Sequence, residues 1–373
     1  MRHLHIAFLL YVLLASGAAA QPQTTWLERL HDFGVFMEKD GKVTCQMRVV
    51  NTGTEPLLIV KAQAGCGCTG INYPEAPIQP GDTAAVSITY NPSGRPGQFT
   101  KQALIFTNTD TKRTILEITG NVIPTDKTLD KQYPIRAGAL RISQQSMPLG
   151  ELTRGKGKTE FLSAYNASTD TLIVHVDGAK PHINPSIVPD TVPPARVTAL
   201  TVHYMSGKAP LWGLNVDTLT LSALPLRQSS HATPGTANIL VMAQVLENFS
   251  DLTGQQLCDA PVVSVDCGDR LDFGAVQEGE TCTRTFTVTN KGKNLLYIRR
   301  LWSPEGEGVT ATLDRQEVKR GKKATVTVTV DTSKLDGNLL NAPLTLICND
   351  PVTPCLNIRL VGFIDKQQQS SSI

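Results

Sequence analysis

Two cysteines separated by a single glycine, Cys66-Gly67-Cys68, are the residues whose type and spacing most directly suggest chemistry. Two thiolates so close in sequence can both reach one soft metal ion, copper or zinc, and Cys45 is the further sulfur ligand within domain range. They could instead form a redox couple, although the usual thiol-exchange motif has two residues between its cysteines and begins a helix. In a third, structural alternative, one cysteine pairs with Cys45 or both are buried as small hydrophobic side chains. We favour the structural alternative and therefore predict no metal and no cofactor.

The chain has eight cysteines, an even number that in an exported protein indicates disulfide bonds. Cys348 and Cys355 flank the turn-forming residues 349–354, so we expect a bridge across a hairpin. Cys258 and Cys267 bracket a polar linker, which a bridge between them would stiffen.

Cys45 gives a third candidate pair. It begins the strand that ends at Asn51, and Cys66 follows the strand that leaves this turn, so both are expected at the same end of a β-sandwich. The candidate disulfides are therefore Cys45 with Cys66, Cys258 with Cys267, and Cys348 with Cys355, and they leave Cys282 over.

Conventional catalytic constellations are missing from the sequence, and we predict that the protein is not an enzyme. Neither His-Glu-x-x-His nor Gly-x-Ser-x-Gly occurs, and residues 150–157 fail as a phosphate-binding loop because Gly157 replaces the required hydroxyl residue. The 35 basic and 33 acidic residues form no block of one sign, which argues against nucleic acid and anionic membrane as partners. We interpret the histidines beyond residue 20 as surface residues; they are His31, His175, His182, His203 and His231.

The chain repeats one pattern three times, a glycine followed by an asparagine at nearly constant spacing. The spacings are 17, 16 and 16 residues, for Gly34 to Asn51, Gly150 to Asn166 and Gly274 to Asn290. In each copy a leucine follows six residues after the asparagine: Leu57, Leu172 and Leu296. Successive glycines lie 116 and 124 residues apart, which is typical of one β-sandwich of about 100 residues per copy.

Apolar residues alternate with polar ones in each copy, as expected for strands with one buried face. The clearest examples are 84–90, 200–204 and 326–330, and each copy closes on an alternating strand at 115–122, 237–245 and 356–364. We find no long segment with helical periodicity. The fold class is therefore all-β, with three tandem immunoglobulin-like β-sandwich domains.

The order of segments along the chain follows from these patterns. Residues 1–20 have the three regions of a secretory signal peptide, with cleavage expected after Ala20, and no later apolar run is long enough to span a membrane. We expect immunoglobulin-like domains at 21–124, 135–246 and 260–365, polar linkers at 124–134 and 247–259, and a disordered tail at 366–373. The second domain carries an inserted loop, Ser222 to Gly235, where the other copies have a short hairpin.

The first copy resembles a bacterial family of secreted domains of unknown function. The residues that carry the resemblance are Phe33-Gly34, Asn51-Thr52-Gly53, Leu57-Leu58-Ile59, Cys66-Gly67-Cys68-Thr69 and Pro80-Gly81. That family is similar to the immunoglobulin-like modules of the abnormal-spindle and hydin type and, more distantly, to the domains of pilus chaperones. The third copy keeps the Phe-Gly and Asn-x-Gly marks, and the second keeps the framework alone.

The resemblance implies an extracytoplasmic scaffold and names no ligand. We therefore predict a non-catalytic, periplasmic or secreted binding and scaffold protein whose partner is a protein or glycan of the cell envelope. The alternative is a thiol or soft-metal protein that acts through Cys66, Cys68 and Cys45.

Overall fold

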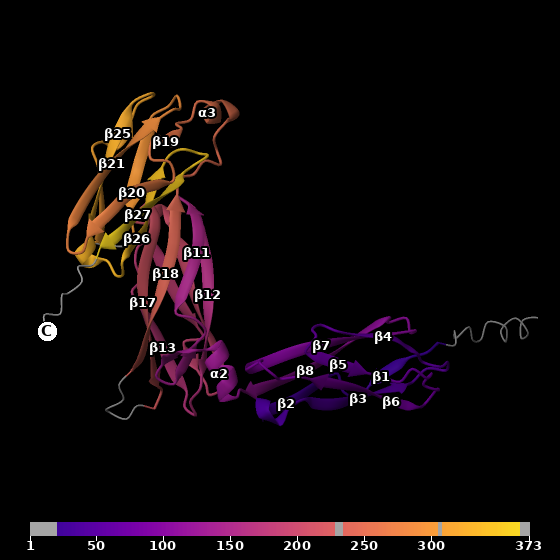
Figure 1. Ribbon diagram of the computed structural model, residues 1–373. Helices are drawn as coiled ribbons and strands as arrows, with labels where there is room; N and C mark the ends of the chain where they lie inside the picture. Colours follow the sequence, from indigo (N-terminus) through magenta and orange to yellow (C-terminus); the bar gives the residue numbers. More distant parts are fainter. Residues whose placement is uncertain (1–20, 228–233, 305–307, 366–373) are drawn as a thin grey trace, which may run out of the picture.

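The computed structural model describes residues 21–227, 234–304 and 308–365, and Figure 1 shows its arrangement. The expected signal peptide, the tail 366–373 and residues 228–233 of the inserted loop lie outside the described residues. The described residues form six sheets, paired in three sandwiches, and the prediction of an all-β, immunoglobulin-like, multi-domain chain is confirmed.

Domain 1 is the sandwich of strands β1 to β8. Its first sheet contains, in spatial order, β1 (Thr24–Trp26), β3 (Val43–Asn51), β6 (Thr83–Tyr90) and β5 (Thr69–Asn72). Its second sheet contains β2 (Leu30–Met37), β8 (Arg113–Ile123), β7 (Gly97–Thr107) and β4 (Ile59–Ala64). A short 3-10 helix, η1 (Glu38–Asp40), follows β2.

Domain 2 is the sandwich of strands β9 to β18. One sheet contains β14 (Ile183–Val188), β16 (Val197–Met205), β12 (Gly157–Asn166), β10 (Leu140–Ile142) and β9 (Ile135–Ala137). The other contains β11 (Ser146–Thr153), β18 (Gly235–Leu246), β17 (Gly213–Pro225), β13 (Leu172–Asp177) and β15 (Thr191–Val192), and η2 (Ser206–Lys208) follows β16.

Domain 3 is the sandwich of strands β19 to β27. One sheet contains β19 (Val263–Val265), β21 (Thr281–Asn290), β25 (Lys323–Asp331) and β23 (Val309–Leu313). The other contains β20 (Arg270–Gln277), β27 (Cys355–Asp365), β26 (Leu339–Cys348), β22 (Leu296–Trp302) and β24 (Glu317–Val318), and η4 (Thr332–Lys334) follows β25.

The repeated glycine marks one β-bulge per domain. In each domain the strand with this glycine pairs in parallel with the last strand, and the register shifts at the bulge. Gly34, Gly150 and Gly274 have φ of 67°, 72° and 70°, a left-handed conformation that side chains other than glycine rarely adopt. In domains 1 and 3 an aspartate two residues earlier accepts a hydrogen bond from the glycine N–H at 2.9 Å.

The repeated asparagine ties each sandwich together from inside. Asn51, Asn166 and Asn290 are fully buried, and each side-chain Nδ2 donates to two backbone carbonyls at 2.7–2.9 Å. Each Oδ1 accepts from the backbone N–H two residues later. A buried amide with all these groups satisfied holds the turn to the neighbouring loop, so this mark is structural.

Each sandwich has its own apolar core, made by the inward-facing alternate residues of its strands. In β25, for example, Val326, Val328 and Val330 are buried, and the threonines between them are partly exposed. The alternation that predicts strands is therefore confirmed at the level of burial.

The first linker is a packed helix, which the sequence patterns did not predict. Helix α2 (Asp126–Gln132) begins after Thr125, whose side chain accepts from the N–H of Thr128. Leu129 and Tyr133 are buried against Tyr165 of domain 2. The segment read as an exposed polar linker is therefore part of the contact between domains, because its few apolar residues all face domain 2.

The second linker also contains a helix, α3 (Gly254–Cys258), which has a capping box formed by Thr253 and Gln256 and no buried residue. Domains 2 and 3 follow each other end to end, and domain 1 projects sideways from the far end of domain 2, so the molecule is bent (Figure 1). Among the described residues, no helix has the length and hydropathy needed to cross a bilayer.

Candidate functional site

Cys66 and Cys68 form a disulfide bond with each other, and their Cα atoms are 5.3 Å apart. They lie in the turn between β4 and β5, where Cys66 is partly exposed and Cys68 is buried. The hydroxyl of Thr69 lies 3.5 Å from Sγ of Cys66 and 3.7 Å from Sγ of Cys68. The pairing with Cys45 that the structural alternative included is therefore wrong, and whether the Cys66–Cys68 bond is structural stays a prediction.

Cys45 does not pair with Cys66, although both pack on the core of domain 1. Cys45 lies on β3, and β6 separates β3 from β5, which begins directly after Cys68. Two strand spacings are roughly 10 Å, and a disulfide needs Cα atoms within about 7 Å. Burial raises the pKa of the Cys45 thiol, with a smaller contribution from Glu28.

The bridge between Cys348 and Cys355 is also absent from the described structure, where both thiols are free. Cys355 pairs across the hairpin with Ile347, so the adjacent Cys348 points to the opposite face of the sheet. Cys348 is fully buried in the core, which raises the pKa of its thiol to about 12. The hairpin was predicted correctly, and the register of its two cysteines excludes the bond.

Cys258 and Cys267 are free as well. Cys258 is exposed on α3, whereas Cys267 packs partly buried on the core of domain 3. No group of three His, Cys, Asp or Glu side chains suited to a metal ion occurs among the described residues.

His182 is buried, which corrects the prediction that all histidines lie on the surface. It is 4% exposed, and its Nε2 lies 2.9 Å from Oδ2 of Asp217, whose Oδ1 accepts from Nζ of Lys180 at 2.6 Å. Burial opposes ionisation of Asp217, but the hydrogen bonds from Lys180 and His182 outweigh it and lower the pKa of the carboxyl. These contacts link the segment before β14 to β17 within domain 2.

The junction between domains 2 and 3 is built around Trp212, which precedes β17. The guanidinium groups of Arg154 and Arg299 lie over its ring, 4.3 and 5.1 Å from the centroid. Arg300 donates to the carbonyls of Trp212 and Leu214 at 3.0 and 2.8 Å, and burial lowers the pKa of its guanidinium. These contacts are charge-assisted and partly desolvated, so they fix the relative position of the two domains.

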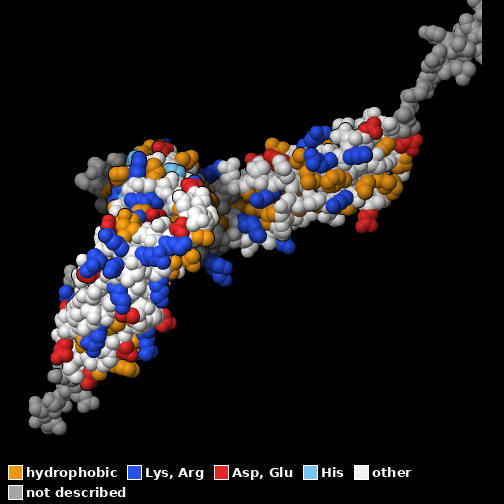
Figure 2. Space-filling view, turned by 90° about the horizontal axis from the view of Figure 1, so that it is seen from above, with side chains coloured by type: hydrophobic (Ala, Val, Ile, Leu, Met, Phe, Trp, Pro, Cys, Tyr) orange, Lys and Arg blue, Asp and Glu red, His pale blue; other side chains and the backbone are white. Residues whose placement is uncertain are grey.

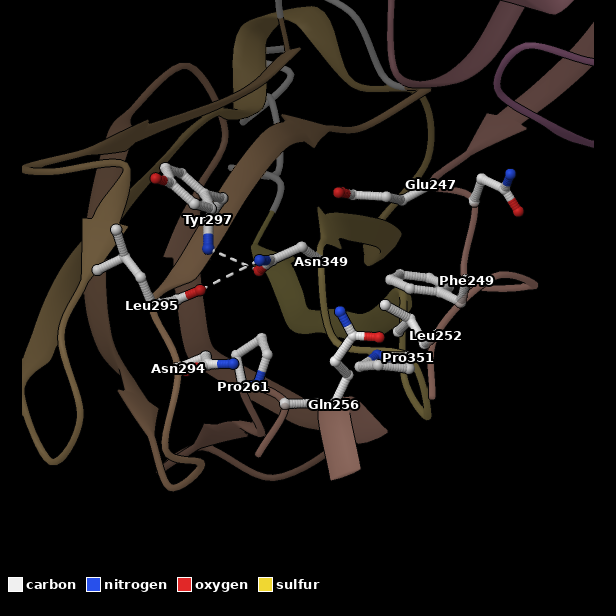
Figure 3. Close-up of a pocket in the computed structure, with 12 residues that line it drawn as sticks. Glu247, Phe249, Leu252, Gln256, Pro261, Asn294, Leu295, Tyr297, Asn349 and Pro351 are labelled. Atoms are coloured by element: carbon white, nitrogen blue, oxygen red, sulfur yellow. Dashed lines mark hydrogen bonds between the residues drawn. The ribbon is translucent and has the colours of Figure 1, made fainter. Parts of the chain in front are cut away.

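A cavity of about 430 Å³ opens beside this junction, between the second linker and domain 3 (Figure 3). The linker contributes Phe249, Leu252 and Gln256, and domain 3 contributes Leu295, Tyr297 and other side chains; the remaining lining residues are Glu247, Asn248, Ala260, Pro261, Asn294, Asn349 and Pro351. In Figure 3, Phe249, Leu252 and Pro351 lie together on one side of the cavity, and Tyr297 and Leu295 lie across from them.

Several polar groups of this cavity are already engaged. The carboxylate of Glu247 accepts two hydrogen bonds of 3.1 Å from Arg299, and Asn349 bonds the backbone of Tyr297 and Leu295 at 2.7 and 3.1 Å. Asn108 makes the same pair of backbone bonds in domain 1, so Asn349 belongs to the framework. The remaining surface consists of aromatic and aliphatic faces with uncharged amides, which suits a neutral polar ligand.

No sequence signal pointed to this cavity, because its walls come from a linker and from turns that meet only after the domains dock. Glu247 and Phe249 lie in the segment assigned to the polar linker.

Two family models match separate parts of the chain. The model described as "Protein of unknown function (DUF1573)" matches residues 24–122, and the model described as "HYDIN/CFA65/VesB-like, Ig-like domain" matches residues 261–362. The chain thus contains a module of this family of unknown function and a hydin-type immunoglobulin-like module, as the resemblance implied. The first match includes Cys66 to Thr69 without singling out that run as a family mark. No curated protein matches the chain in sequence.

Solved structures are similar to parts of the chain at low identity. A crystal structure of a protein of unknown function from Porphyromonas gingivalis W83 is 19% identical, covers 61% of this chain and 100% of its own, and has a TM-score of 0.49. The periplasmic chaperone SfaE is 13% identical with coverages of 61% and 100% and a TM-score of 0.25. A PapD-like domain of human CEP192 is 12% identical with coverages of 30% and 87% and a TM-score of 0.26. At these values the matches carry no inference about function.

Proposed function

We propose that this chain is a non-catalytic, extracytoplasmic scaffold whose immunoglobulin-like domains bind a protein or glycan of the cell envelope. The observation that carries the proposal is the pair of built interdomain junctions. Domains joined by free linkers are expected to move relative to each other. Here the first linker is buried through Leu129 and Tyr133, and Arg299 and Arg300 bind domain 3 to domain 2.

The cavity beside Trp212 is the proposed binding site for the envelope partner. It combines concavity, aromatic walls and uncharged hydrogen-bonding groups, which are the usual features of a ligand site. Because Arg299 neutralises Glu247, the cavity offers no free charge from that pair, and the proposed ligand segment is neutral and polar.

Affinity capture from the native envelope, followed by mass spectrometry, tests this site. The variant Phe249→Ala removes one aromatic wall, and the captured partner should fall at least about tenfold, because a buried aromatic contact carries about 1.4 kcal/mol or more. Leu257→Ala is the matched control, since Leu257 is exposed on α3 outside the cavity lining. Equal capture by Phe249→Ala and the wild type would refute the assignment of the partner to this cavity.

The proposed location is tested separately. Fractionation of the native host should place the chain outside the cytoplasm, with a mature N-terminus at Gln21. A cytoplasmic chain that retains Met1 would contradict the extracytoplasmic proposal.

A second candidate function, thiol–disulfide exchange, is favoured by the bond between Cys66 and Cys68. A partner thiolate would attack one sulfur, form a mixed disulfide and release the other cysteine as a thiolate. A second partner thiol would then resolve the mixed disulfide, which leaves the partner oxidised and both cysteines of this chain reduced.

Thiol labelling distinguishes the two functions. For the scaffold, Cys66 and Cys68 stay bonded in protein isolated from the cell, and the double variant Cys66→Ser and Cys68→Ser still captures the partner. Mixed disulfides trapped at Cys66, which disappear in the double variant, would support exchange instead. Stoichiometric copper or zinc in protein purified without chelator would revive the soft-metal alternative.

A further inference from the structure

Both interdomain junctions use the same three positions of the preceding domain. These positions are the residue after the bulge glycine, its partner on the last strand, and the residue opposite that partner on the neighbouring strand. We call them the forward face. They are Val35, Asn121 and Gln98 in domain 1, Glu151, Gln244 and Leu214 in domain 2, and Ala275, Phe363 and Leu339 in domain 3.

The forward face of domain 1 contacts domain 2. All three of its residues line a small cavity closed by Arg196 of domain 2. The glycine before Gln98, Gly97, has φ of 87°, and a side chain there would come within 3.0 Å of Val197. This close approach places the forward face directly on the following domain.

The forward face of domain 2 contacts domain 3 in the same way. Gln244 donates to Sγ of Cys355 at 3.6 Å, and the carbonyl of Leu214 accepts from Arg300. The glycine before Leu214, Gly213, also has a positive φ, of 74°. A Cβ atom at this position would lie 3.0 Å from the side chain of Ile347.

The forward face of domain 3 has no following domain among the described residues, and it is apolar. Leu339 and Phe363 stand directly opposite each other on β26 and β27 and are 56% and 67% exposed. The same positions hold Gln98 and Asn121 in domain 1, which are polar. Two large apolar side chains side by side on a surface that serves as an interface elsewhere in the molecule indicate a docking site.

Domain 2 receives domain 1 through Arg196 and Val197, whereas the surface of domain 3 that receives domain 2 has an equivalent in domain 1. In domain 3 it consists of Arg300, Ile347 and Cys355, next to the bulge at Arg299. The β4–β7–β8 register of domain 1, with the same bulge at Val60, places Lys61, Phe106 and Arg113 at these positions. We call these residues and Val60 the receiving face of domain 1.

The receiving face of domain 1 is exposed and complementary to the forward face of domain 3. Val60 is 66% exposed, and Lys61 lies over the ring of Phe106 at 5.9 Å instead of binding a neighbouring domain. Figure 2 shows hydrophobic and basic side chains next to each other on the arm formed by domain 1. The forward face of domain 3 is flanked by the exposed carboxylates of Asp336 and Asp365. Their negative charges are complementary to the positive charges of Lys61 and Arg113.

We propose that the forward face of domain 3 in one copy docks on the receiving face of domain 1 in a second copy, so that the chain assembles head to tail. The two faces lie near the opposite ends of the bent molecule in Figure 1, and a single chain cannot satisfy both. A contact between two different surfaces is heterologous, and it therefore builds open chains or rings instead of a closed two-fold dimer. The assembly is independent of the envelope partner proposed above.

Sedimentation velocity or light scattering of the purified chain over a range of concentrations tests the proposal. The wild type should show a mass that grows with concentration beyond the dimer. Phe363→Asp on the forward face and Val60→Asp on the receiving face should each weaken association at least about tenfold, because each puts a charge into an apolar contact. Phe161→Asp is the matched control, since Phe161 is 68% exposed in domain 2 and belongs to neither face.

Mixing the two variants gives the decisive result. The Phe363→Asp chain keeps a working receiving face and the Val60→Asp chain keeps a working forward face, so an equimolar mixture should form a 1:1 complex that grows no further. A wild type that stays monomeric at all concentrations overturns the proposal. So does association that survives in Phe363→Asp, or a mixture that remains monomeric.

Discussion

The two interdomain junctions use equivalent ends of domains 1 and 2, but they hold the next domain by different chemistry. At the first junction the contact is mediated by α2, whose N-terminus is bound by the carboxylate of Glu38. At the second junction helix α3 of the linker has no buried residue, and Trp212 with Arg299 and Arg300 joins the domains directly. The same end of an immunoglobulin-like module can thus bind the next domain either through a packed helix or through stacked guanidinium groups.

The junctions also differ in how well their buried polar groups are satisfied. At the first, Oδ1 of Asn121 and Nη1 of Arg196 are buried without a hydrogen-bond partner among the described residues. At the second, Arg300 finds two carbonyls and Arg299 a carboxylate, although Nη1 of Arg154 has no partner in the described structure. Unsatisfied buried groups cost stability, so we expect the second junction to be the stronger one.

Removing Trp212 should give the largest effect. Trp212→Ala deletes the ring under two guanidinium groups and should lower the free energy that holds domain 3 against domain 2 by about 2–3 kcal/mol. Limited proteolysis should show faster cleavage in residues 247–259, while α2 remains protected. Leu211→Ala, an exposed residue one position away, is the control. Unchanged protection of the second linker would show that the indole does not hold this junction.

The glycines of the forward faces provide a closer comparison. Gly97→Ala and Gly213→Ala should each cost about 1 kcal/mol for the positive φ and more for the 3.0 Å approach of Val197 or Ile347. Gly81→Ala isolates the backbone cost, because Gly81 has φ of 83° with nothing within 4 Å. Thermal unfolding should therefore rank both junction variants below Gly81→Ala. Equal losses in all three variants would mean that neither junction is closely packed.

The stability of the first junction, where Glu38 binds the N-terminus of α2, should depend on pH. The stability of the second junction, where guanidinium groups stack on Trp212, should not. Burial opposes ionisation of Glu38, but bonds from the N–H of Gly94 and Thr125 and from the hydroxyl of Thr128 outweigh it, so the pKa of the carboxyl is lowered. A depressed folded-state pKa adds stability that is present above the unfolded pKa and is lost as pH falls through the folded pKa.

Hydrogen exchange of the α2 amides tests whether the stability from Glu38 is lost as pH falls. The protection of the α2 amides, taken relative to their intrinsic exchange rate at each pH, should fall between neutral pH and about pH 3 in the wild type. In Glu38→Gln the protection should be low at neutral pH already and change little on acidification. Exchange in β17 beside Trp212 serves as the internal reference. An α2 segment that stays protected at low pH would rule out the Glu38 clamp.

Much of each sandwich was predictable from the sequence, because strand alternation and the repeated Gly and Asn depend on local geometry. Gly34 needs its positive φ, and Asn51 needs its buried carbonyls, within a single domain. The cysteine pairs were not predictable, because pairing depends on register: Cys355 opposes Ile347, and β6 lies between Cys45 and β5.

The junctions and the cavity were also beyond the sequence, for a different reason. The apolar residues of α2 are too few to show helical periodicity, and Leu129 and Tyr133 gain their meaning only against Tyr165 of domain 2. His182 likewise looks like a surface residue until the fold brings Asp217, 35 positions away, to its ring. Residues that form contacts between domains do not recur at a regular spacing in the sequence, so no periodic pattern indicates them.

These two junctions hold the three domains in one arrangement, and small-angle X-ray scattering of the monomeric Phe363→Asp chain is the sharpest test of the claim. A single bent arrangement of domains 1, 2 and 3 should fit the scattering profile across the whole angular range. The profile of Trp212→Ala in the same background should instead require a distribution of domain 3 positions. A Phe363→Asp profile that can be fitted only by an ensemble of freely jointed domains would contradict the claim.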